Sequence, residues 1–493
     1  MRLDRMIAGL PYLMDTSGDM GVEIQRLCMN SRDEAPEGLF FCFKGIRSDA
    51  HFFADQAVRN GCVALIVERF LTDVRVPQVL VSNGRAAMAR VSAAFYGHPA
   101  EQMKIVGITG TKGKTTTSYM LKSILETAGH KCGLIGTTGS YIGDKLLSSN
   151  LTTPDPIDLN RDLRSMADEG AEYVVMEVSA HALDMHRLDG LEFEAGVFTN
   201  LSRDHLDYFG DMESYLAVKK RFFTDGYVKN TAYNADDEAV AHALQGIKMP
   251  NMTFGICQES DVFARDIEVH DDSVSMMLCL RDIQPVPVVL NMVGVFNIYN
   301  AIAAASLAMI LGISLEYIKE GLEAIKTVPG RVELLQTQTP FKVILDYSHS
   351  TNALENILQT VRLFTKGKVI VVFGCGGGRD RGKRPDMGER GGRLADYCVL
   401  TSDNPRMEDP MDILKAVEEG IKRTQGKYIV IENRKDAIKH ALLEAEENDT
   451  VVLAGKGDET YQDIMGVKYP FNEKEIVIDI LTEMKKAFEG VRV

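Results

Sequence analysis

One glycine-rich segment, Gly110-Thr111-Lys112-Gly113-Lys114-Thr115-Thr116, contains the residue types that bind phosphate groups. Backbone N–H groups of a glycine turn at the start of a helix form an anion cradle, which glycine lets the phosphates approach closely. Lys114 is expected to reach the β- and γ-phosphates, and the Thr115 hydroxyl is expected to bind Mg²⁺. The longer G-x-x-x-x-G-K-[ST] pattern is not matched, because position 108 is Ile. The segment predicts a site for a nucleoside triphosphate, most readily ATP.

The residues around this loop favour a nucleotide site over an ordinary turn that happens to contain Gly-Lys-Thr. Residues 104–109 form a short apolar run typical of a buried strand. After the loop, Leu121, Ile124, Leu125 and Ala128 recur with the spacing of one helix face, and Gly129 suits the position just after a helix. The sequence therefore predicts a strand, a glycine turn and a helix.

Two more polar residues follow strand-like runs and could neutralise charge near a phosphate. Glu177 lies in the run 173–179, and His205 follows the run 193–202. Phosphoryl transfer to a carboxylate brings two anions together, so such a site needs metal and lysine. A strand-end Glu is usually solvated and a lone His is usually a satisfied polar residue. Each becomes a candidate magnesium ligand only in combination with the loop.

The elements that must position these residues alternate between strands and helices. Strand-like runs at 342–348, 368–378, 397–405, 427–434 and 449–457 are each followed by a helical stretch. Such alternation indicates an α/β fold with doubly wound parallel sheets, whose binding sites lie at the carboxyl ends of the strands. Residues 1–98 instead hold short strand-like runs separated by polar turns.

Length and composition limit the classes of function. A chain of 493 residues corresponds to about three domains at roughly 150 residues each. With 70 acidic and 55 basic residues the net charge is −15, which disfavours nucleic acid and anionic lipid. No apolar run is long enough to span a bilayer and no signal peptide is recognisable, so we expect a cytoplasmic protein without membrane insertion. The eight scattered cysteines are expected to be reduced thiols. We also expect the protein to be a monomer.

Beyond these local patterns, the chain resembles the Mur ligase family over nearly its whole length. The segments that carry the resemblance, in chain order, are GITGTKGKTTT, LTTPDP, MEVSAHAL, FTNLSRDHLDYFGDMESY, VFNIYNA, VPGRVE, LDYSHS, GCGGGRDRGKRPDMG, TSDNPRMEDP and AGKGDETYQ. The resemblance implies a UDP-substrate-binding domain at 1–98, a central P-loop ATPase domain at 99–330, and a Rossmann-like amino-acid-binding domain at 331–493. It is strongest to the members that add the third amino acid to the peptidoglycan precursor.

The resemblance also implies roles for residues around the magnesium ion. Catalysis would involve Lys114, Glu177, His205 and Lys219, with Thr115, Glu177, His205 and Lys219 around the metal. Family members carbamylate the lysine four residues after the tyrosine of this segment, and Tyr215 plus four is Lys219. By default a helical lysine is a solvent-facing charge. Phe209 departs from the His that is common in the family.

For ATP, the resemblance adds Asn297, Arg331 and Asp346 to residues 110–116. Asp346 has independent support, because an acidic residue that closes a parallel strand is well placed for ribose hydroxyls. The alternative is that Asp346 caps the helix expected to begin near Asn352. For the UDP-linked substrate, the resemblance suggests Arg32, the loop 44–51, and a set of hydroxyl and guanidinium groups, namely Ser31, Thr152, Thr153, Ser179 and Arg187.

The resemblance places the incoming amino acid on two C-terminal segments, through Arg379, Asp403, Asn404, Pro405, Arg406, Gly455 and Glu459. meso-Diaminopimelate differs from lysine by a second carboxylate at its far end, and Arg406 offers that carboxylate a planar bidentate donor. Asp458 and Lys112 depart from the family's usual His and Asn. An extra carboxylate at Asp458 would favour L-lysine if it points into the pocket. An Arg406 guanidinium facing lysine's bare ammonium would be repulsive, so diaminopimelate is preferred.

The leading hypothesis is an ATP-dependent amide ligase that adds meso-diaminopimelate to the D-glutamyl γ-carboxylate of UDP-N-acetylmuramoyl-L-alanyl-D-glutamate through an acyl phosphate. The first alternative is the same ligation with L-lysine. A folate polyglutamate synthetase should lack the front domain and the Thr152-Thr153 pair. A mechanical P-loop ATPase would need a coiled coil or basic stripe, and neither is present. A non-catalytic UDP-sugar-binding protein is disfavoured because the candidate catalytic residues are all intact.

Overall fold

The computed structural model describes residues 1–45, 48–148, 151–256, 260–270 and 272–490, with side chains up to 485. The chain forms two compact units. The first comprises Met1–Leu201, Leu216–Thr253 and Ala303–Tyr317, and the second comprises Ser202–Tyr215, Phe254–Ile302 and Ile318–Val493. Among the described residues, no helix is both long and apolar enough to cross a membrane. Seven cysteines are buried and free, and Cys257 lies outside the described residues.

The first unit begins with a five-stranded sheet in the order β1-β5-β4-β3-β2. Its strands are β1 (Leu13–Ser17), β2 (Arg26–Cys28), β3 (Gly38–Cys42), β4 (Cys62–Val67) and β5 (Gln78–Val81). All neighbours are parallel except β1 and β5. The helices of this region are α1 (Leu3–Met6), α2 (Ala54–Arg59) and α3 (Gly84–Phe95). Strands β3 and β4 are among the short strand-like runs expected before residue 98.

The second sheet of this unit carries the glycine loop. Its strands run in the order β12-β11-β6-β10-β7-β8-β9. They are β6 (Lys104–Thr109), β7 (Cys132–Gly136), β8 (Gly139–Ile142), β9 (Lys145–Ser148), β10 (Tyr173–Glu177), β11 (Ala195–Phe198) and β12 (Thr231–Asn234). From β12 to β7 neighbours are parallel, whereas β7, β8 and β9 form antiparallel hairpins. The carboxyl ends of β6, β10 and β11 therefore meet at one edge, as the strand-end motifs require.

The helix after the loop is α4 (Lys114–Thr127), and it buries the predicted face through Leu121, Ile124 and Leu125. It ends as predicted, because Gly129 has a φ of +89° that a side chain would strain. The Gly129 N–H donates to Glu126 O and the His130 N–H to Leu125 O, which closes the helix end. The other helices of this part are α5 (Pro156–Asp168), α6 (Ala180–Asp184), α8 (Met212–Thr224) and α9 (Glu238–Leu244).

The second unit contains a group of antiparallel strands that the sequence patterns did not reveal. Strands β14 (Val262–Val269), β15 (Val274–Leu280) and β16 (Ile283–Leu290) pair in sequence, and the end of β13 (Asn251–Gly255) runs parallel to β14. Their side chains do not alternate regularly between buried and exposed along β14 and β16, which hid the period of two. Helices α10 (Phe296–Ile310) and α11 (Leu315–Ala324) follow.

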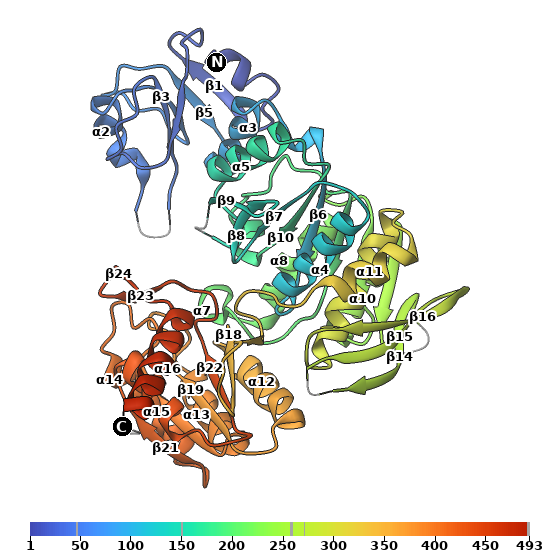
Figure 1. Ribbon diagram of the computed structural model, residues 1–493. Coiled ribbons are helices and arrows are strands. Elements are labelled where there is room, and N and C mark those ends of the chain that lie inside the picture. The colour runs from blue at the N-terminus through green and yellow to red at the C-terminus, as the bar shows by residue number, and fades with distance from the viewer. Residues whose placement is uncertain (46–47, 149–150, 257–259, 271, 491–493) are drawn as a thin grey trace. The chain divides into compact units, whose positions relative to one another are not determined.

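The C-terminal sheet runs in the order β17-β18-β22-β19-β20-β21 and confirms the five predicted strands. Its strands are β17 (Glu333–Leu334), β18 (Lys342–Asp346), β19 (Val369–Phe373), β20 (Tyr397–Leu400), β21 (Lys427–Val430) and β22 (Thr450–Ala454). All are parallel to their neighbours except β17 (Figure 1, orange and red).

Helices cover both faces of this C-terminal sheet, as a doubly wound fold requires. One face packs on α12 (Thr351–Phe364), α13 (Lys383–Leu394) and α14 (Pro410–Ile421). The other face packs on α15 (Arg434–Glu444) and α16 (Glu473–Gly490). A separate hairpin of β23 (Tyr461–Ile464) and β24 (Val467–Pro470) follows β22.

Candidate active site

The glycine loop joins β6 to α4 and is held by the end of β11. The Thr111 N–H donates to the Asn200 carbonyl and the Lys112 N–H to Asn200 Oδ1, each at 2.9 Å. The Lys112 carbonyl accepts from Thr199 Oγ1 at 2.7 Å. These contacts orient the loop at the start of α4, where Gly113 has a φ of +85° and Thr115 and Thr116 are buried. The N-terminus of the helix is therefore preformed for an anion.

Gly110 could not be replaced by a larger residue. Its φ is +144°, and a Cβ there would lie 2.0 Å from Thr199 Oγ1. Two lysines converge on its carbonyl oxygen. Lys114 Nζ donates to Gly110 O at 3.0 Å and to Thr111 O at 3.1 Å, and Lys219 Nζ donates to Gly110 O at 2.9 Å. Two lysine side chains therefore lie beside the loop.

Lys219 is not a solvent-facing helical charge. It lies in α8, and its side chain is 1% exposed. Because Nζ lies within hydrogen-bond distance of Gly110 O, the side chain that is predicted to be carbamylated lies at the phosphate loop. A carbamate would keep an N–H for that carbonyl and would add two anionic oxygens. Lys220, the neighbouring residue, is exposed.

Glu177, at the end of β10, is buried and bonded on both carboxylate oxygens. Oε1 accepts from the Thr137 N–H at 2.9 Å, and Oε2 accepts from Thr137 Oγ1 at 3.2 Å. Gly136 is required beside it, because a Cβ would lie 2.3 Å from Glu177 Oε1. Sequence reasoning missed Thr137, whose only signal is its place just after the neighbouring parallel strand β7.

Four of the six individual residues predicted for the UDP-linked substrate lie together with Glu177. Thr152 Oγ1 is 3.1 Å from Thr137 Oγ1, and Thr153 Oγ1 donates to Glu177 O at 2.8 Å. Thr153 Oγ1 also lies 3.2 Å from Ser179 Oγ. Arg187 donates from Nη1 to Thr153 O at 2.7 Å and pairs through Nε with Asp155. This cluster of hydroxyls, a carboxylate and a guanidinium suits a phosphorylated or carboxylated ligand.

Another of these six residues, Ser31, belongs to the N-terminal sheet region. Its hydroxyl donates to Gln56 Oε1 at 3.1 Å, and its carbonyl accepts from Asn60 Nδ2. In the predicted loop 44–51, residues 46–47 lie outside the described residues. The loop's last residue, His51, is 4% exposed and lies 2.6 Å through Nδ1 from Asp49 Oδ1. Together with Arg69, this histidine keeps the pKa of Asp49 near 2 despite the opposing effect of desolvation.

The remaining predicted magnesium ligand, His205, belongs to the second unit. It precedes α7 (Leu206–Phe209) with a φ of +56°, and its N–H donates to Asp204 Oδ1. Its ring lies edge-on to Tyr215. Within the described part of the chain, no three His, Cys, Asp or Glu side chains converge as a ready metal site. The donor types still suit Mg²⁺, which takes few protein ligands beside phosphate and water oxygens.

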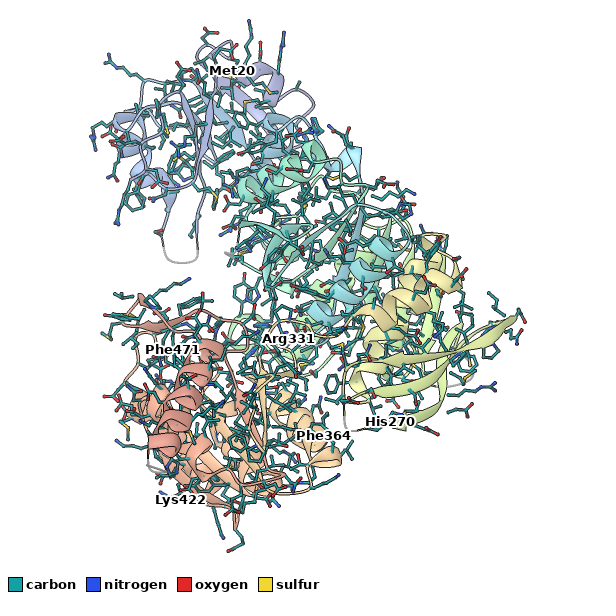
Figure 2. All side chains as sticks on the ribbon, in the orientation of Figure 1. Met20, His270, Arg331, Phe364, Lys422 and Phe471 are labelled. Carbon is teal, nitrogen blue, oxygen red and sulfur yellow. The ribbon has the colours of Figure 1, made fainter. Side chains whose placement is uncertain are left out.

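The residues predicted for adenosine also lie in the second unit. Asn297 is buried, and it donates from Nδ2 to Val293 O and accepts from Asn300. The Arg331 guanidinium lies 4.4 Å from the centre of the Tyr347 ring (Figure 2 labels Arg331).

Asp346 is not the helix cap that was the alternative to ribose binding. Helix α12 begins at Thr351 with Ser350 as its N-cap. Asp346 Oδ2 accepts from the Val332 N–H at 2.8 Å, and Oδ1 accepts from the Ser348 hydroxyl. Burial raises the pKa of this carboxyl above its ordinary value. A buried carboxylate with such limited pairing has capacity for further hydrogen-bond donors.

The predicted amino-acid segment, residues 403–406, is clamped by the chain around β22 and β23. Asn404 Nδ2 donates to Glu459 Oε2 at 2.8 Å, and Asn404 Oδ1 accepts from Lys456 Nζ at 3.0 Å. Gly455 has a φ of +124°, and a Cβ there would lie 2.5 Å from Asp403 Oδ2. Sequence reasoning missed Lys456, although it stands between two predicted residues in AGKGDE.

Arg406 itself is held by the β23–β24 hairpin in a left-handed conformation with a φ of +52°. Its N–H donates to Asp463 O at 2.9 Å, and its carbonyl accepts from the Met465 N–H at 2.7 Å. Its guanidinium donates to Gly377 O at 2.6 Å and lies 3.9 Å from the Asp463 carboxylate. A Cβ at Gly377 would lie 1.9 Å from the Pro405 carbonyl oxygen, so a larger residue does not fit there. Arg379 is exposed and lies near Gly376.

Two domain models of one protein family match long parts of the chain. Residues 108–308 match the model of the Mur ligase middle domain, and residues 330–457 match that of the Mur ligase glutamate ligase domain. The chain is 41% identical over 487 residues to the UDP-N-acetylmuramoyl-L-alanyl-D-glutamate–2,6-diaminopimelate ligase of Caldanaerobacter subterraneus subsp. tengcongensis, covering 99% of this chain and 100% of that protein.

Two further relatives carry the same name. The diaminopimelate ligase 1 of Clostridium acetobutylicum is 42% identical over 489 residues, covering 98% of this chain and 100% of that protein. A solved structure of a UDP-N-acetylmuramoyl-L-alanyl-D-glutamate–2,6-diaminopimelate ligase superposes with a TM-score of 0.68 at 28% identity. That match covers 98% of this chain and 99% of the solved chain.

Proposed function

Because the chain belongs to the Mur ligase family, we propose that it joins meso-diaminopimelate to the D-glutamyl γ-carboxylate of UDP-N-acetylmuramoyl-L-alanyl-D-glutamate in peptidoglycan synthesis. The observation that carries this proposal is the match over the full length of ligases with that name. In this proposal, the cluster at the glycine loop would bind ATP and the cluster at residues 403–406 would bind the amino acid.

The reaction has two steps. The γ-carboxylate oxygen attacks the γ-phosphorus of ATP, the bond from that phosphorus to the bridging oxygen breaks, and ADP leaves with the electron pair. The amine of the incoming amino acid then attacks the acyl phosphate carbon, inorganic phosphate leaves, and the amine loses a proton. Lys114 and the N–H groups at the start of α4 would bind the phosphates and stabilise their charge. Exclusion of water matters, because an acyl phosphate hydrolyses easily.

Magnesium would be held by Thr115, Glu177 and carbamylated Lys219, with His205 from the second unit as a further ligand. When bound, the ion neutralises charge between the phosphates and the attacking carboxylate. Two features support the carbamate: Lys219 is buried, and its amine lies at the Gly110 carbonyl of the loop. An anion at this position would offset the positive charge of Lys114.

The UDP-linked substrate would be bound by the cluster of Thr152, Thr153, Ser179 and Arg187, with Ser31 in the N-terminal sheet region. The shared hydrogen bonds of this cluster with Glu177 support the idea that the substrate carboxylate is brought to the ATP site. Asn297, Arg331 and Asp346 would bind the nucleoside part of ATP. A cytoplasmic location and a monomeric state also belong to this proposal.

Diaminopimelate is favoured over L-lysine by Arg406. Its guanidinium is fixed by Gly377 O on one side, and its remaining donors suit the second carboxylate of diaminopimelate. Asp458, the residue that could have favoured lysine, has its backbone N 2.4 Å from where a Gly330 Cβ would lie. Its charge also helps to raise the pKa of Tyr347, after the larger effect of burial. Both observations place Asp458 beside the 330–347 region.

The test is a side-by-side assay of phosphate release with meso-diaminopimelate and L-lysine, each with ATP and the UDP-linked dipeptide. We expect release to require both the dipeptide and the amino acid, with diaminopimelate preferred by at least about tenfold in kcat/KM. Arg406→Ala should reduce that preference, and Arg423→Ala, a change at an exposed arginine of the same unit, should not. A preference for lysine would show that the Arg406 argument is wrong.

A further inference from the structure

Lys456 is a fully buried lysine at the centre of the predicted amino-acid site. Its side chain is 0% exposed, and it follows β22 in the segment AGKGDE. Nζ donates to Asn404 Oδ1 at 3.0 Å and to Glu459 Oε2 at 3.1 Å. The two residues that it contacts are themselves joined by a hydrogen bond of 2.8 Å. Lys456 therefore links the two segments that are proposed to bind the amino acid.

Two aromatic rings also lie near the Lys456 ammonium. Nζ lies 5.8 Å from the centre of the Tyr461 ring and 6.0 Å from that of Phe471, which is labelled in Figure 2. These rings belong to the hairpin region that holds Arg406. Both distances are within the range of a cation–π contact, which favours a positive charge at this position.

The surroundings of Lys456 are acidic. Asp403 is 6% exposed and Glu459 lies at hydrogen-bond distance. Burial works to raise the pKa of Asp403, but Lys456 and Arg434 together hold it below its ordinary value. Arg434 is already paired with Glu473 at 2.7 Å, and both side chains are 0% exposed. Lys456 is thus a buried cation that interacts with both Asp403 and Glu459.

We propose that Lys456 is a positioning residue for amino-acid selection: by binding Asn404 and Glu459 and balancing their acidic surroundings, it lets this site accept a substrate with a second carboxylate. The inference rests on the proposed function. Without the buried cation, Glu459 and Asp403 would repel the second carboxylate of diaminopimelate, whereas L-lysine has none at that end. Loss of Lys456 should therefore harm the reaction with diaminopimelate more than the reaction with lysine.

The experiment compares Lys456→Met, Lys456→Gln and Lys456→Arg with the wild-type enzyme, measuring kcat and KM for both amino acids, ATP and the UDP-linked dipeptide. For Met and Gln, which lack the charge, we expect the KM for diaminopimelate to rise about thirtyfold. The preference for diaminopimelate over lysine should fall at least about fivefold. The KM values for ATP and the dipeptide should stay within about twofold. Arg keeps the charge and should retain the preference.

Lys427→Met, at an exposed lysine on β21, is the matched control and should behave as wild type. Thermal unfolding of each variant separates folding defects from selectivity. If Lys456→Met does not fold, Lys456→Gln carries the comparison, because its amide can still donate to Asn404. An equal loss with both amino acids, or an unchanged preference in the neutral variants, overturns the proposal. A wild-type enzyme that is inactive with both amino acids would instead contradict the proposed function.

Discussion

The glycine loop and the amino-acid segment are held in place in opposite ways. Around the loop, Lys114 and Lys219 donate to backbone carbonyls, and Thr199 and Asn200 supply neutral hydrogen bonds. Around residues 403–406, the contacts come from buried charges of both signs, with Lys456 between Asn404 and Glu459. The contacts of the first region join lysines and neutral donors to the backbone, whereas those of the second region join charged side chains of both signs.

This difference follows from the ligands that the two regions are proposed to bind. A triphosphate is strongly anionic. Its site therefore needs cations and N–H groups that can exchange a hydrogen bond to a carbonyl for one to a phosphate oxygen. An amino acid with two carboxylates and two ammonium groups needs charges of both signs at fixed positions. Such charges keep their positions only when they are buried and paired.

The role of the glycine loop is tested most directly by Lys114→Ala. Removal of the cation should lower kcat by about 10³-fold or more, because the ammonium that is expected to reach the γ-phosphate is lost. Binding of the UDP-linked dipeptide, measured by calorimetry, should persist. Lys122→Ala, on the same helix and paired with Glu126, is the control and should keep its turnover. Unchanged turnover in Lys114→Ala would refute the assignment of the loop.

Lys219→Ala should lower kcat by about 10²-fold, because an anion near magnesium is lost. Small carboxylic acids added in solution should restore part of the activity. NMR of enzyme equilibrated with ¹³C-bicarbonate should show a carbamate carbon that is absent from the variant. Lys220→Ala, at the exposed neighbour, should keep both the signal and the activity. If wild type shows no carbamate under conditions of full activity, the modification is excluded.

Gly455→Ala tests whether the predicted amino-acid segment, residues 403–406, depends on close packing around the buried Asp403 carboxylate. A Cβ at 2.5 Å from Asp403 Oδ2 must displace that carboxylate, and a φ of +124° strains any side chain. We expect a loss of about 2 kcal/mol in the free energy of unfolding and a tenfold or greater rise in the KM for diaminopimelate. Gly466→Ala, with a φ of +78° but no atom closer than 3.9 Å, should cost only the backbone strain. Equal effects at both glycines would contradict the packing argument.

The smallest effect is expected for Asp346→Asn, measured as thermal stability against pH. Burial raises the pKa of Asp346 above 3.8, so ionisation costs the folded state stability as pH rises through that raised pKa. The variant should match wild type below pH 3.8 and become relatively more stable above the raised pKa, within about 1 kcal/mol. Its KM for ATP should rise about tenfold if the carboxylate binds the ribose. A pH-independent difference in stability would show that Asp346 does not titrate as described.

Much of the fold could be predicted from local pattern. The strands β6, β10, β18, β19, β20, β21 and β22 all lie within predicted apolar runs, and α4 begins at Lys114 directly after the loop. Parallel buried strands are continuous apolar runs, which makes them easy to recognise. The antiparallel strands β14 to β16 escaped prediction, because their exposed and buried residues do not alternate regularly.

The glycine loop could be found from the sequence alone because its chemistry is local: strand, turn, cation and helix follow one another within 24 residues. The partners of that loop could not be found in this way. Lys219 reaches the Gly110 carbonyl across 109 residues, and Thr137 reaches Glu177 across 40. Only the side-by-side order of parallel strands brings such segments to one edge, and that order is not written in any short stretch of sequence. Lys456 could not be identified from the sequence for the same reason, because its proposed role depends on a contact with Asn404 across 52 residues.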